Sequence, residues 1–168
     1  MSFSPIADIK FKKLADIEPK YLACRGIKLL LLDIDNTVSP YKINEPTEEM
    51  KKWVKDMKDA GIKLFFVSNN NGDRPAIFSE KLGVPYIKSA MKPSRRGVIK
   101  AMERCGCTKK ETALVGDQSY TDVLCANRSG VTSILVHPIS LKNPLLAVRY
   151  VLELPFRALA REKNARCK

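Results

Sequence analysis

Two aspartates directly follow an apolar run, and their type and spacing could support acid–base or metal chemistry. Residues 27–32 are apolar except for Lys28, as in a strand covered on both faces, and Asp33 and Asp35 come next. If the extended backbone continues to Asp35, both carboxylates point to the same side. Two like charges at that distance repel, so one carboxylate takes up a proton unless a cation lies between them. The alternative is an acidic turn that caps the following helix.

Other polar residues follow the later apolar runs in the same way. Each run is a predicted strand, and the polar groups at or near the strand ends are Ser68, Asn69, Lys92, Asp117 and Asp122. Taken singly, Ser68 could cap a helix, Lys92 could be a solvated surface lysine and Asp117 could form a turn. In a parallel sheet, the carboxyl ends of the strands share one edge, where ligands bind. The joint pattern therefore predicts one site that combines a hydroxyl, an ammonium group and several carboxylates.

The segments between these residues must form the scaffold that positions them. Thr47 is a candidate N-cap, Gly61 is a candidate helix terminator, and apolar residues between them recur at helical spacing: Met50, Trp53, Val54 and Met57. Further elements are predicted as helices at 75–82, 95–105 and up to 128, and as strands at 62–67, 84–87, 112–115 and 131–136. Strands that alternate with helices predict an α/β fold with a parallel sheet and helices on both faces.

The chemistry-bearing residues also resemble a known family. Read in chain order, they are similar to the four motifs of the haloacid dehalogenase (HAD) superfamily phosphatases: Asp33-x-Asp35-x-Thr37, Ser68, Lys92 and Gly116-Asp117-x4-Asp122. The resemblance covers residues 28–136, and many members carry Gly where this chain has Asn36. Segments 17–28, 68–71 and 78–85 look like the YqeG subgroup of class IIIA, which is similar to the phosphatidylglycerophosphatases that make phosphatidylglycerol. The resemblance implies a three-layer, Rossmann-like sheet.

By this resemblance, the site hydrolyses phosphate monoesters through a covalent intermediate. Asp33 is the implied nucleophile; it forms an aspartyl-phosphate and so divides one difficult displacement into two easier ones. Asp35 is the implied acid and base, which protonates the leaving oxygen and then deprotonates the attacking water. The implied cofactor is Mg²⁺, held by Asp33, the backbone carbonyl of Asp35 and Asp117.

The remaining motif residues are implied to bind the phosphate or to support the residues that do. Ser68 is expected to donate a hydrogen bond to a phosphoryl oxygen, and Lys92 to neutralise charge in the transition state. Asn69 is a further candidate for contact with the phosphate, through its backbone or its side chain. Asp122 is expected to orient Lys92 or a water of the metal site rather than to bind the metal itself.

Many HAD enzymes insert a cap domain between their motifs, and that domain limits which substrates reach the site. Here the segment from Thr37 to Ser68 has room for a loop, a helix and a strand, and the segment from Ser68 to Lys92 for a helix and a short strand. Neither segment leaves room for a cap domain. We therefore expect an open rim, which suits a large substrate such as a lipid head group, a protein or a nucleic acid end.

The charge of the chain indicates an anionic partner, because the formal net charge is +12 and the isoelectric point is near 9.6. The C-terminal segment 139–168 is basic and carries apolar residues at helical spacing: Leu141, Leu145, Val148, Leu152, Phe156 and Leu159. This segment could lie on an anionic membrane surface as a peripheral contact. The favoured alternative is a final helix that packs on the sheet through the same stripe. Pro155 is expected to break or kink this helix, and two pieces are predicted rather than one.

The N-terminal segment 1–26 leaves the same two alternatives open, since lysines lie close to Ile9, Phe11 and Leu14. No apolar run approaches the roughly 20 residues of a membrane span, and the first residues do not resemble a secretory signal. The five cysteines are odd in number and fit a reducing cytosol better than a disulfide framework. The pair Cys105 and Cys107 is expected to be incidental.

These features predict one domain over residues 1–168, a capless HAD-like phosphatase that requires Mg²⁺. By resemblance, the substrate is phosphatidylglycerophosphate, and the protein is cytoplasmic or peripheral on the inner face of the membrane. The alternative in the same class is a phosphatase of a soluble nucleotide, sugar or protein phosphate. The alternative in another class is a basic RNA- or protein-binding module, which the intact acids disfavour because binding alone has no use for Asp35 beside Asp33. The sequence does not indicate an oligomeric state.

Overall fold

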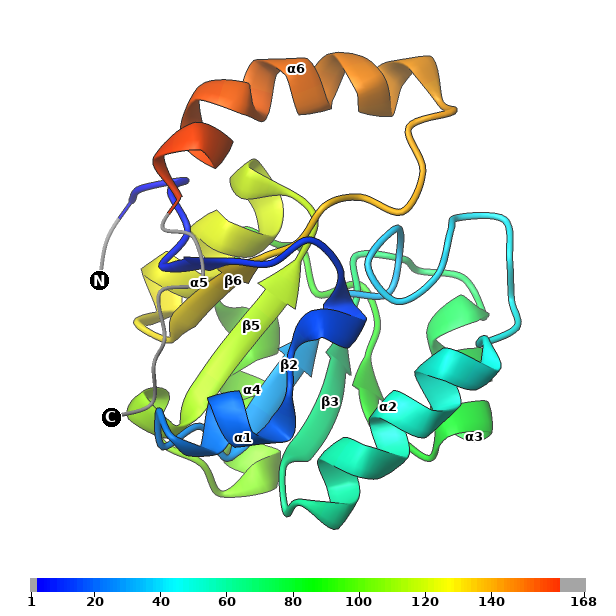
Figure 1. Cartoon of the computed structure of the whole chain (residues 1–168), viewed down its shortest axis with the longest axis vertical. Helices are drawn as coiled ribbons and strands as arrows, with labels where there is room; N and C mark the ends of the chain where they lie inside the picture. The colour runs from blue at the N-terminus through cyan, green and yellow to red at the C-terminus, as the bar shows by residue number, and fades with distance from the viewer. Residues whose placement is uncertain (1–2, 161–168) are drawn as a thin grey trace.

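The strands of the protein form one parallel, six-stranded sheet (Figure 1). The structure is a computed structural model that describes residues 3–160. The strand order is β1-β6-β5-β2-β3-β4, and every neighbouring pair is parallel. The strands are β1 (Ile9–Lys10), β2 (Leu29–Leu32), β3 (Lys63–Val67), β4 (Tyr86–Ile87), β5 (Thr112–Gly116) and β6 (Thr132–Leu135).

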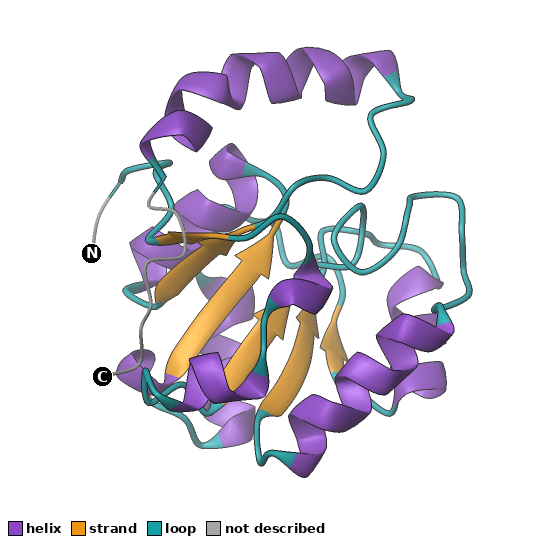
Figure 2. Ribbon diagram, in the orientation of Figure 1, coloured by secondary structure: helices purple, strands orange, loops and turns teal. Residues whose placement is uncertain are grey.

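Helices cover both faces of this sheet, as Figure 2 shows, and the predicted α/β architecture is confirmed. Successive residues of β2 contribute to opposite cores: Leu30 and Leu32 pack with the first group of helices, and Leu29 and Leu31 with the second. The first group is α1 (Pro19–Ala23), α2 (Glu48–Asp59) and α3 (Arg74–Leu82). The second is α4 (Arg96–Cys105) and α5 (Leu124–Ser129), which a π-helical turn over Ser119–Val123 precedes.

Helix α2 shows how the local sequence sets the scaffold. The hydroxyl of Thr47 accepts a hydrogen bond from the backbone N–H of Met50 at 3.2 Å, so Thr47 caps the first turn. Gly61 follows the helix with a φ of 79°, a left-handed conformation that glycine adopts at little cost. All four apolar residues of the predicted stripe are buried. The prediction of a helix at this place is confirmed.

The N-terminal segment packs onto the sheet at a place where the sequence predicted no strand. Strand β1 pairs with β6, with Ile9 opposite Ile134. Ile9, Phe11 and Leu14 are buried in the core. Two residues are too few to show the period of a strand, so local pattern could not identify β1. For the described part of this segment, packing on the core is the correct alternative.

The last described helix, α6 (Pro144–Leu159), corrects two expectations. We predicted two pieces separated at Pro155, but the helix continues through this residue, because an internal proline removes one hydrogen bond and can bend a helix without ending it. Packing through the apolar stripe is also wrong, since Leu145, Val148 and Leu152 are exposed. Figure 1 shows α6 crossing the carboxyl-terminal side of the sheet. The end of the predicted C-terminal segment, residues 161–168, lies outside the described residues.

None of the helices within residues 3–160 combines the length and the hydropathy needed to cross a membrane.

The strand order creates the place where a site can form. From β2 the chain runs to β3 on one side, whereas β5 and β6 lie on the other side. Connections that diverge in this way leave a crevice beyond the carboxyl ends of the central strands. Asp33 follows β2 and Asp117 follows β5, and these two strands are paired. The fold therefore brings these two aspartates, which are far apart in sequence, to the same edge.

Candidate active site

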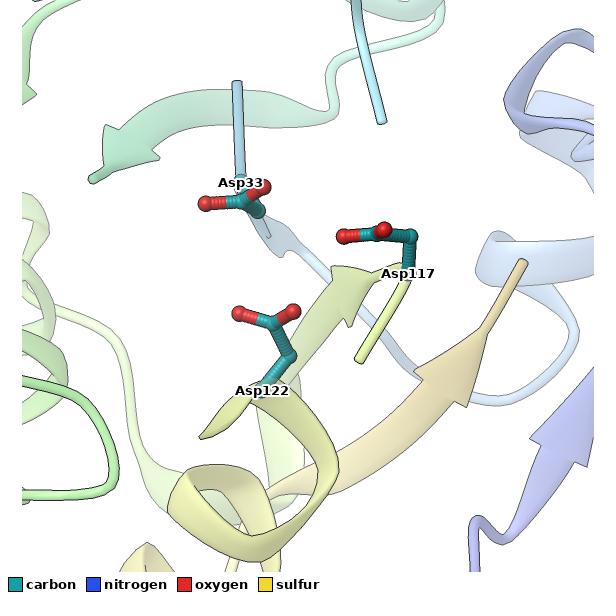
Figure 3. Close-up of side chains that lie close together, drawn as sticks. All are labelled: Asp33, Asp117 and Asp122. Atoms are coloured by element: carbon teal, nitrogen blue, oxygen red, sulfur yellow. The ribbon is translucent and has the colours of Figure 1, made fainter. Parts of the chain in front are cut away.

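Three buried carboxylates meet beyond the ends of β2 and β5. Asp33 follows β2, Asp117 follows β5, and Asp122 lies in the π-helical turn. One carboxylate oxygen of each lies within 4.8 Å of the others. Figure 3 shows the three side chains directed toward a common space. Oxygen ligands in such a group fit Mg²⁺ or a similar hard divalent cation.

The ammonium group of Lys92 lies between two of these carboxylates. Its Nζ is 2.5 Å from Asp33 Oδ1 and 2.6 Å from Asp122 Oδ1. The side chain of Asn69 holds the backbone of Lys92: its amide donates to the Lys92 carbonyl at 3.1 Å, and its oxygen accepts from the Lys92 N–H at 2.7 Å. Both polar groups of the Asn69 side chain thus position Lys92. Contact between Asn69 and a phosphate stays a prediction.

Burial and crowding alter the protonation of these groups. Burial raises the pKa of Asp33 to about 7; Lys92 opposes this rise and Asp122 adds to it. Burial also raises the pKa of Asp117 well above its usual value, and the charges of Asp122 and Asp33 contribute further. Burial lowers the pKa of Lys92, but the charges of Asp122 and Asp33 outweigh it and raise that pKa. Three carboxylates against one ammonium group leave excess negative charge, which a divalent cation would neutralise.

The turn after Asp33 connects the site to the segment before α6. Thr37 Oγ1 lies 3.3 Å from Asp33 Oδ2 and 3.4 Å from Asp117 Oδ1. Asn36 has a φ of 65°, a left-handed conformation that asparagine tolerates better than most residues, so it can stand where a glycine would serve. Its amide donates to the carbonyl of Ser140 at 2.8 Å, and its side-chain oxygen accepts from the Ser140 N–H at 2.9 Å. A glycine could not make this link.

The carboxylate of Asp35 is not one of the three clustered carboxylates; it lines the same pocket as Asp33 and Asp122 and is held by a buried arginine. Arg74 Nε is 2.7 Å from Asp35 Oδ1, and the amide of Asn70 donates to Asp35 Oδ2 at 3.3 Å. The guanidinium of Arg74 also donates to oxygens of the loop over residues 39–44: the carbonyls of Ser39, Pro40 and Ile43 and the side chain of Asn44. Sequence reasoning missed Arg74, because an arginine in the first turn of a helix usually faces solvent.

Ser68 stands at the end of β3, on the strand next to β2, and is fully buried. Its Oγ accepts a hydrogen bond from the backbone N–H of Asn70 at 3.1 Å. Its own N–H and carbonyl bond to Ile87 and Ala90 at 3.0 and 2.9 Å. These contacts fix the residue and leave the hydroxyl hydrogen available for donation. Its predicted role toward a phosphate requires such a donor.

Gly116 leaves the space that Asp122 occupies. A Cβ at Gly116 would lie 2.2 Å from Asp122 Cγ, far inside van der Waals contact. The Asp122 carboxylate is further held by the backbone N–H of Gln118, which donates to Oδ2 at 3.1 Å. Glycine at this motif position is therefore required by sterics, because any side chain would displace the carboxylate that pairs with Lys92.

We expect Gly116→Ala to impair phosphate release from an aryl phosphate, the activity that the sequence predicts, by at least about tenfold, because a displaced Asp122 no longer positions Lys92. The added methyl group should also destabilise the fold by about 1–3 kcal/mol. Gly61→Ala is the matched control: its Cβ would meet open space, but its φ of 79° strains an alanine. The control should lose stability and keep activity. Equal activity of the two variants would contradict the role of Gly116.

The site opens into a pocket of about 310 Å³. Five predicted residues line it: Asp33, Asp35, Asn69, Lys92 and Asp122. Sequence analysis did not identify the other four, which are Tyr41, Gln118, Thr121 and Arg149. Tyr41 comes from the loop after β2 and Arg149 from α6, so the expected open rim is bordered by two elements. Arg149 lies off the apolar stripe of the C-terminal segment, and this position was the one sequence feature that could have indicated a role for it at the rim. Nothing in the sequence indicates such a role for Tyr41.

The two rim residues can act as hydrogen-bond donors. Burial raises the pKa of Tyr41 to about 12, so its hydroxyl keeps its proton at neutral pH. Arg149 donates from Nη1 to the side-chain oxygen of Gln118 at 2.6 Å, which holds the guanidinium at the mouth of the pocket. Together with Lys92 at the base of the pocket, Arg149 gives an anionic ligand two points of positive charge.

Comparison with known sequences matches this fold and site to one family. Residues 17–136 match the haloacid dehalogenase-like hydrolases. The matched range contains every predicted site residue and ends before α6.

Two relatives with curated descriptions are named as phosphatases. The chain is 38% identical over 129 residues to "Probable phosphatase YqeG" of Bacillus subtilis (strain 168), a match that covers 77% of this chain and 75% of that protein. It is 26% identical over 167 residues to phosphatidylglycerophosphate phosphatase 1, chloroplastic/mitochondrial, of Arabidopsis thaliana. This second match covers 91% of the chain and 47% of that protein, so the chain spans about half of its length.

A solved structure has a similar fold. It is the 3-deoxy-D-manno-octulosonate 8-phosphate phosphatase of Moraxella catarrhalis, in complex with a magnesium ion, a phosphate ion and a KDO molecule. The TM-score is 0.50 and the sequence identity 17%, over 82% of this chain and 91% of that chain. At this level of identity, the similarity concerns the fold alone.

Proposed function

This chain belongs to the haloacid dehalogenase-like hydrolase family, and from that premise we propose that it uses Mg²⁺ and an aspartyl-phosphate at Asp33. The family and the phosphatase relatives make it a phosphoric monoester hydrolase. The observation that carries the mechanistic proposal is the single buried cluster of Asp33, Lys92, Asp117 and Asp122. This cluster combines a carboxylate nucleophile with a fixed positive charge and a set of metal ligands.

In the first half-reaction, Asp33 accepts the phosphoryl group. One of its carboxylate oxygens forms a bond to phosphorus while the bond from phosphorus to the leaving oxygen breaks. Asp35 gives its proton to the leaving oxygen, so an alcohol departs and Asp35 becomes a carboxylate. Lys92 supplies positive charge to the phosphoryl oxygens, and Ser68 donates a hydrogen bond. The product on the protein is the aspartyl-phosphate.

In the second half-reaction, water attacks the phosphorus of the aspartyl-phosphate. Asp35 takes a proton from this water, and the bond between phosphorus and the Asp33 oxygen breaks. Inorganic phosphate leaves, Asp33 is again a carboxylate, and Asp35 is again protonated. Arg74 Nε lies 2.7 Å from Oδ1 of Asp35 and holds this side chain at the wall of the pocket, so the proton that Asp35 gives and takes is carried on its other oxygen, Oδ2.

Asp33, Asp117 and the backbone carbonyl of Asp35 would hold the Mg²⁺. The close approach of three buried carboxylates supports this assignment. The raised pKa values of Asp33 and Asp117 agree with it, since burial first and the neighbouring carboxylates second make the ionised forms costly without a cation. When bound, the ion supplies charge that screens the nucleophile from the anionic phosphate. Asp122 is proposed to hold Lys92, whose ammonium lies 2.6 Å from it.

The proposed substrate is phosphatidylglycerophosphate. The match to a phosphatidylglycerophosphate phosphatase over 91% of the chain supports this choice, as does the net charge of +12. We further propose that residues 1–168 act as one domain, since a single sheet organises the described part, and that it works at the inner face of the membrane. The pocket mouth with Arg149 would then receive the phosphate of a lipid head group.

The direct test is a phosphate-release screen with Mg²⁺. The substrates are phosphatidylglycerophosphate, nucleotides, sugar phosphates and phosphopeptides, each with and without detergent. We expect the highest kcat/KM for the lipid. A higher value for a soluble phosphate would reassign the substrate and leave the phosphatase chemistry in place. No release from any substrate would contradict the proposed mechanism and favour a binding module.

We expect Asp117→Asn to stabilise the metal-free protein and to abolish its response to Mg²⁺. The pKa of Asp117 is raised, so its ionised form costs folding free energy, a cost that appears as the pH rises above the usual pKa of an aspartate. A neutral amide removes that cost, and 1 kcal/mol corresponds to about 2–4 °C in Tm for a protein of this size. Mg²⁺ should raise the Tm of the wild type and leave that of Asp117→Asn unchanged, because a ligand stabilises only a protein that binds it.

Thermal unfolding with Mg²⁺ and with a chelator measures both effects. Asp59→Asn on α2, where the carboxylate is 62% exposed, is the matched control and should respond to Mg²⁺ as the wild type does. A normal Mg²⁺ response in Asp117→Asn would remove this residue from the proposed ligands.

A further inference from the structure

Helix α6 buries charged side chains and exposes its apolar stripe, which is the reverse of an ordinary surface helix. It buries Glu153 and Arg157, which are 1% and 5% exposed, whereas a packing helix buries its apolar stripe. Eight of the thirteen large apolar side chains that are exposed in the described residues fall between 139 and 159, so they form a patch rather than isolated sites. We call the exposed helical part of this patch the outer face of α6; it comprises Leu145, Val148, Val151, Leu152, Leu154 and Leu159.

The inner face explains why the helix has this orientation. Glu153 accepts a hydrogen bond from the N–H of Tyr120 at 3.4 Å. Arg157 donates to the carbonyls of Asp117 and Val136. The Phe156 ring packs edge-on against Tyr120, with the centroids 5.5 Å apart. These contacts fix α6 against residues 117–120, next to the site, and in this orientation the outer face of the helix points to solvent.

Charges around the outer face favour an anionic occupant. Glu153 is the only acidic residue between 139 and 160, and it is buried. Lys142 and Arg149 are exposed on the same segment, and Lys42 of the neighbouring loop lines the same pocket as Lys142. In the sequence, residues 161–168 add four basic residues against one acidic. An apolar helix face bordered by basic residues fits the interface of an anionic bilayer.

We propose that the outer face of α6 docks on an anionic phospholipid bilayer and presents the active-site pocket to lipid head groups. The part that concerns the substrate rests on the proposed function. Arg149 belongs to α6 and lines the pocket, so docking and substrate access involve the same helix. A second pocket of about 760 Å³ lies between the 40–43 loop and the start of α6 and shares Tyr41 with the first. It offers room for the glycerol part of a lipid.

The test compares the binding of full-length variants to vesicles by sedimentation. The vesicles are phosphatidylcholine with phosphatidylglycerol, and phosphatidylcholine alone; the wild type should bind the anionic vesicles more strongly. The doublet Leu145→Gln/Leu152→Gln should weaken binding roughly 100-fold, because it removes apolar surface from the interface. The doublet Leu145→Met/Leu152→Met keeps that surface and should bind as the wild type does.

A second comparison isolates the contribution of charge. Lys142→Gln should weaken binding to the anionic vesicles about fivefold, since each basic residue near the surface contributes to attraction. Lys55→Gln on α2, where the lysine side chain is 73% exposed, is its control. Equal binding of these two variants, together with equal binding to both vesicle types, would contradict an anionic bilayer as the occupant.

Activity measurements separate this proposal from the proposed function. Both doublets should hydrolyse a soluble aryl phosphate at the wild-type rate. The Gln doublet should lose hydrolysis of phosphatidylglycerophosphate in vesicles and retain it in detergent. Absence of vesicle binding by the wild type overturns docking even if the lipid is hydrolysed in detergent. Binding without hydrolysis of this lipid in either form overturns the substrate and supports docking.

Size-exclusion chromatography tests whether a second copy of the chain, rather than a bilayer, occupies the outer face of α6. A wild-type dimer that the Gln doublet converts to a monomer, without any vesicle binding, would assign the outer face to self-association and overturn the proposal. A wild type that stays monomeric and binds anionic vesicles supports it.

Discussion

Asp33→Asn is expected to reduce the kcat for Mg²⁺-dependent phosphate release by at least about 1000-fold, because the amide cannot form the aspartyl-phosphate. The substitution nearly preserves the size of the side chain and removes one of three crowded negative charges. The folded protein should therefore be retained, so the loss would reflect chemistry rather than unfolding. Steady-state phosphate release measures the kcat, and circular dichroism shows whether the variant is folded. Trapping of the phosphorylated protein shows whether the aspartyl-phosphate forms.

The matched control for this substitution is Asp59→Asn, since Asp59 is an exposed aspartate of α2 that pairs with Lys55. It should leave both activity and phosphorylation unchanged. Wild-type activity in Asp33→Asn would remove the nucleophile assignment. Loss of turnover with continued formation of a phosphorylated protein would place the nucleophile at another residue.

Lys92→Met is expected to affect activity and stability together. The ammonium lies 2.5 Å from Asp33 and 2.6 Å from Asp122, and its side chain is 2% exposed. Its removal leaves two buried carboxylates without their partner, which should destabilise the fold by about 3–5 kcal/mol. The kcat should fall by about 100- to 1000-fold, as for other preorganised groups that stabilise transition-state charge.

The stability loss in Lys92→Met should depend on pH with a defined sign. The pKa of Asp33 is already raised to about 7, chiefly by burial, and Lys92 is the group that lowers it. Without Lys92 this pKa rises further, so the loss of stability relative to the wild type should grow as the pH rises above about 7, where ionisation of Asp33 costs the folded variant more free energy than it costs the wild type. Urea unfolding at a series of pH values should therefore show the largest difference in the free energy of unfolding between wild type and Lys92→Met at the highest pH. Lys55→Met, at an exposed lysine, should show neither effect.

The local sequence was sufficient to predict a strand or a helix where the residues of one segment determine its structure. The apolar runs that became β2, β3 and β5, and the stripe and caps of α2, depend on residues within a few positions of one another. The same holds for the polar residues at the strand ends, because a parallel sheet brings all carboxyl ends to one edge. This reasoning predicted that Asp33, Lys92, Asp117 and Asp122 converge, although their catalytic roles stay predictions.

Pairings between distant segments were beyond local reasoning. Strand β1 exists through its pairing with β6, and Arg74 reaches Asp35 across 39 positions in a pocket that only packing creates. Arg149 and Tyr41 line the same pocket because α6 and the loop after β2 lie over the same edge of the sheet. No spacing in the sequence encodes such distances, since each depends on how whole elements are placed.

The sequence by itself determined the alternation of strands and helices, the edge at which the acids gather and the family. Only the tertiary structure decided which way α6 faces. Periodicity shows that one side of that helix is apolar, but it cannot show which side meets the protein. Here the contacts of Glu153 and Arg157 with the loop around Asp117 outweigh burial of the leucines, and the apolar side is left outward.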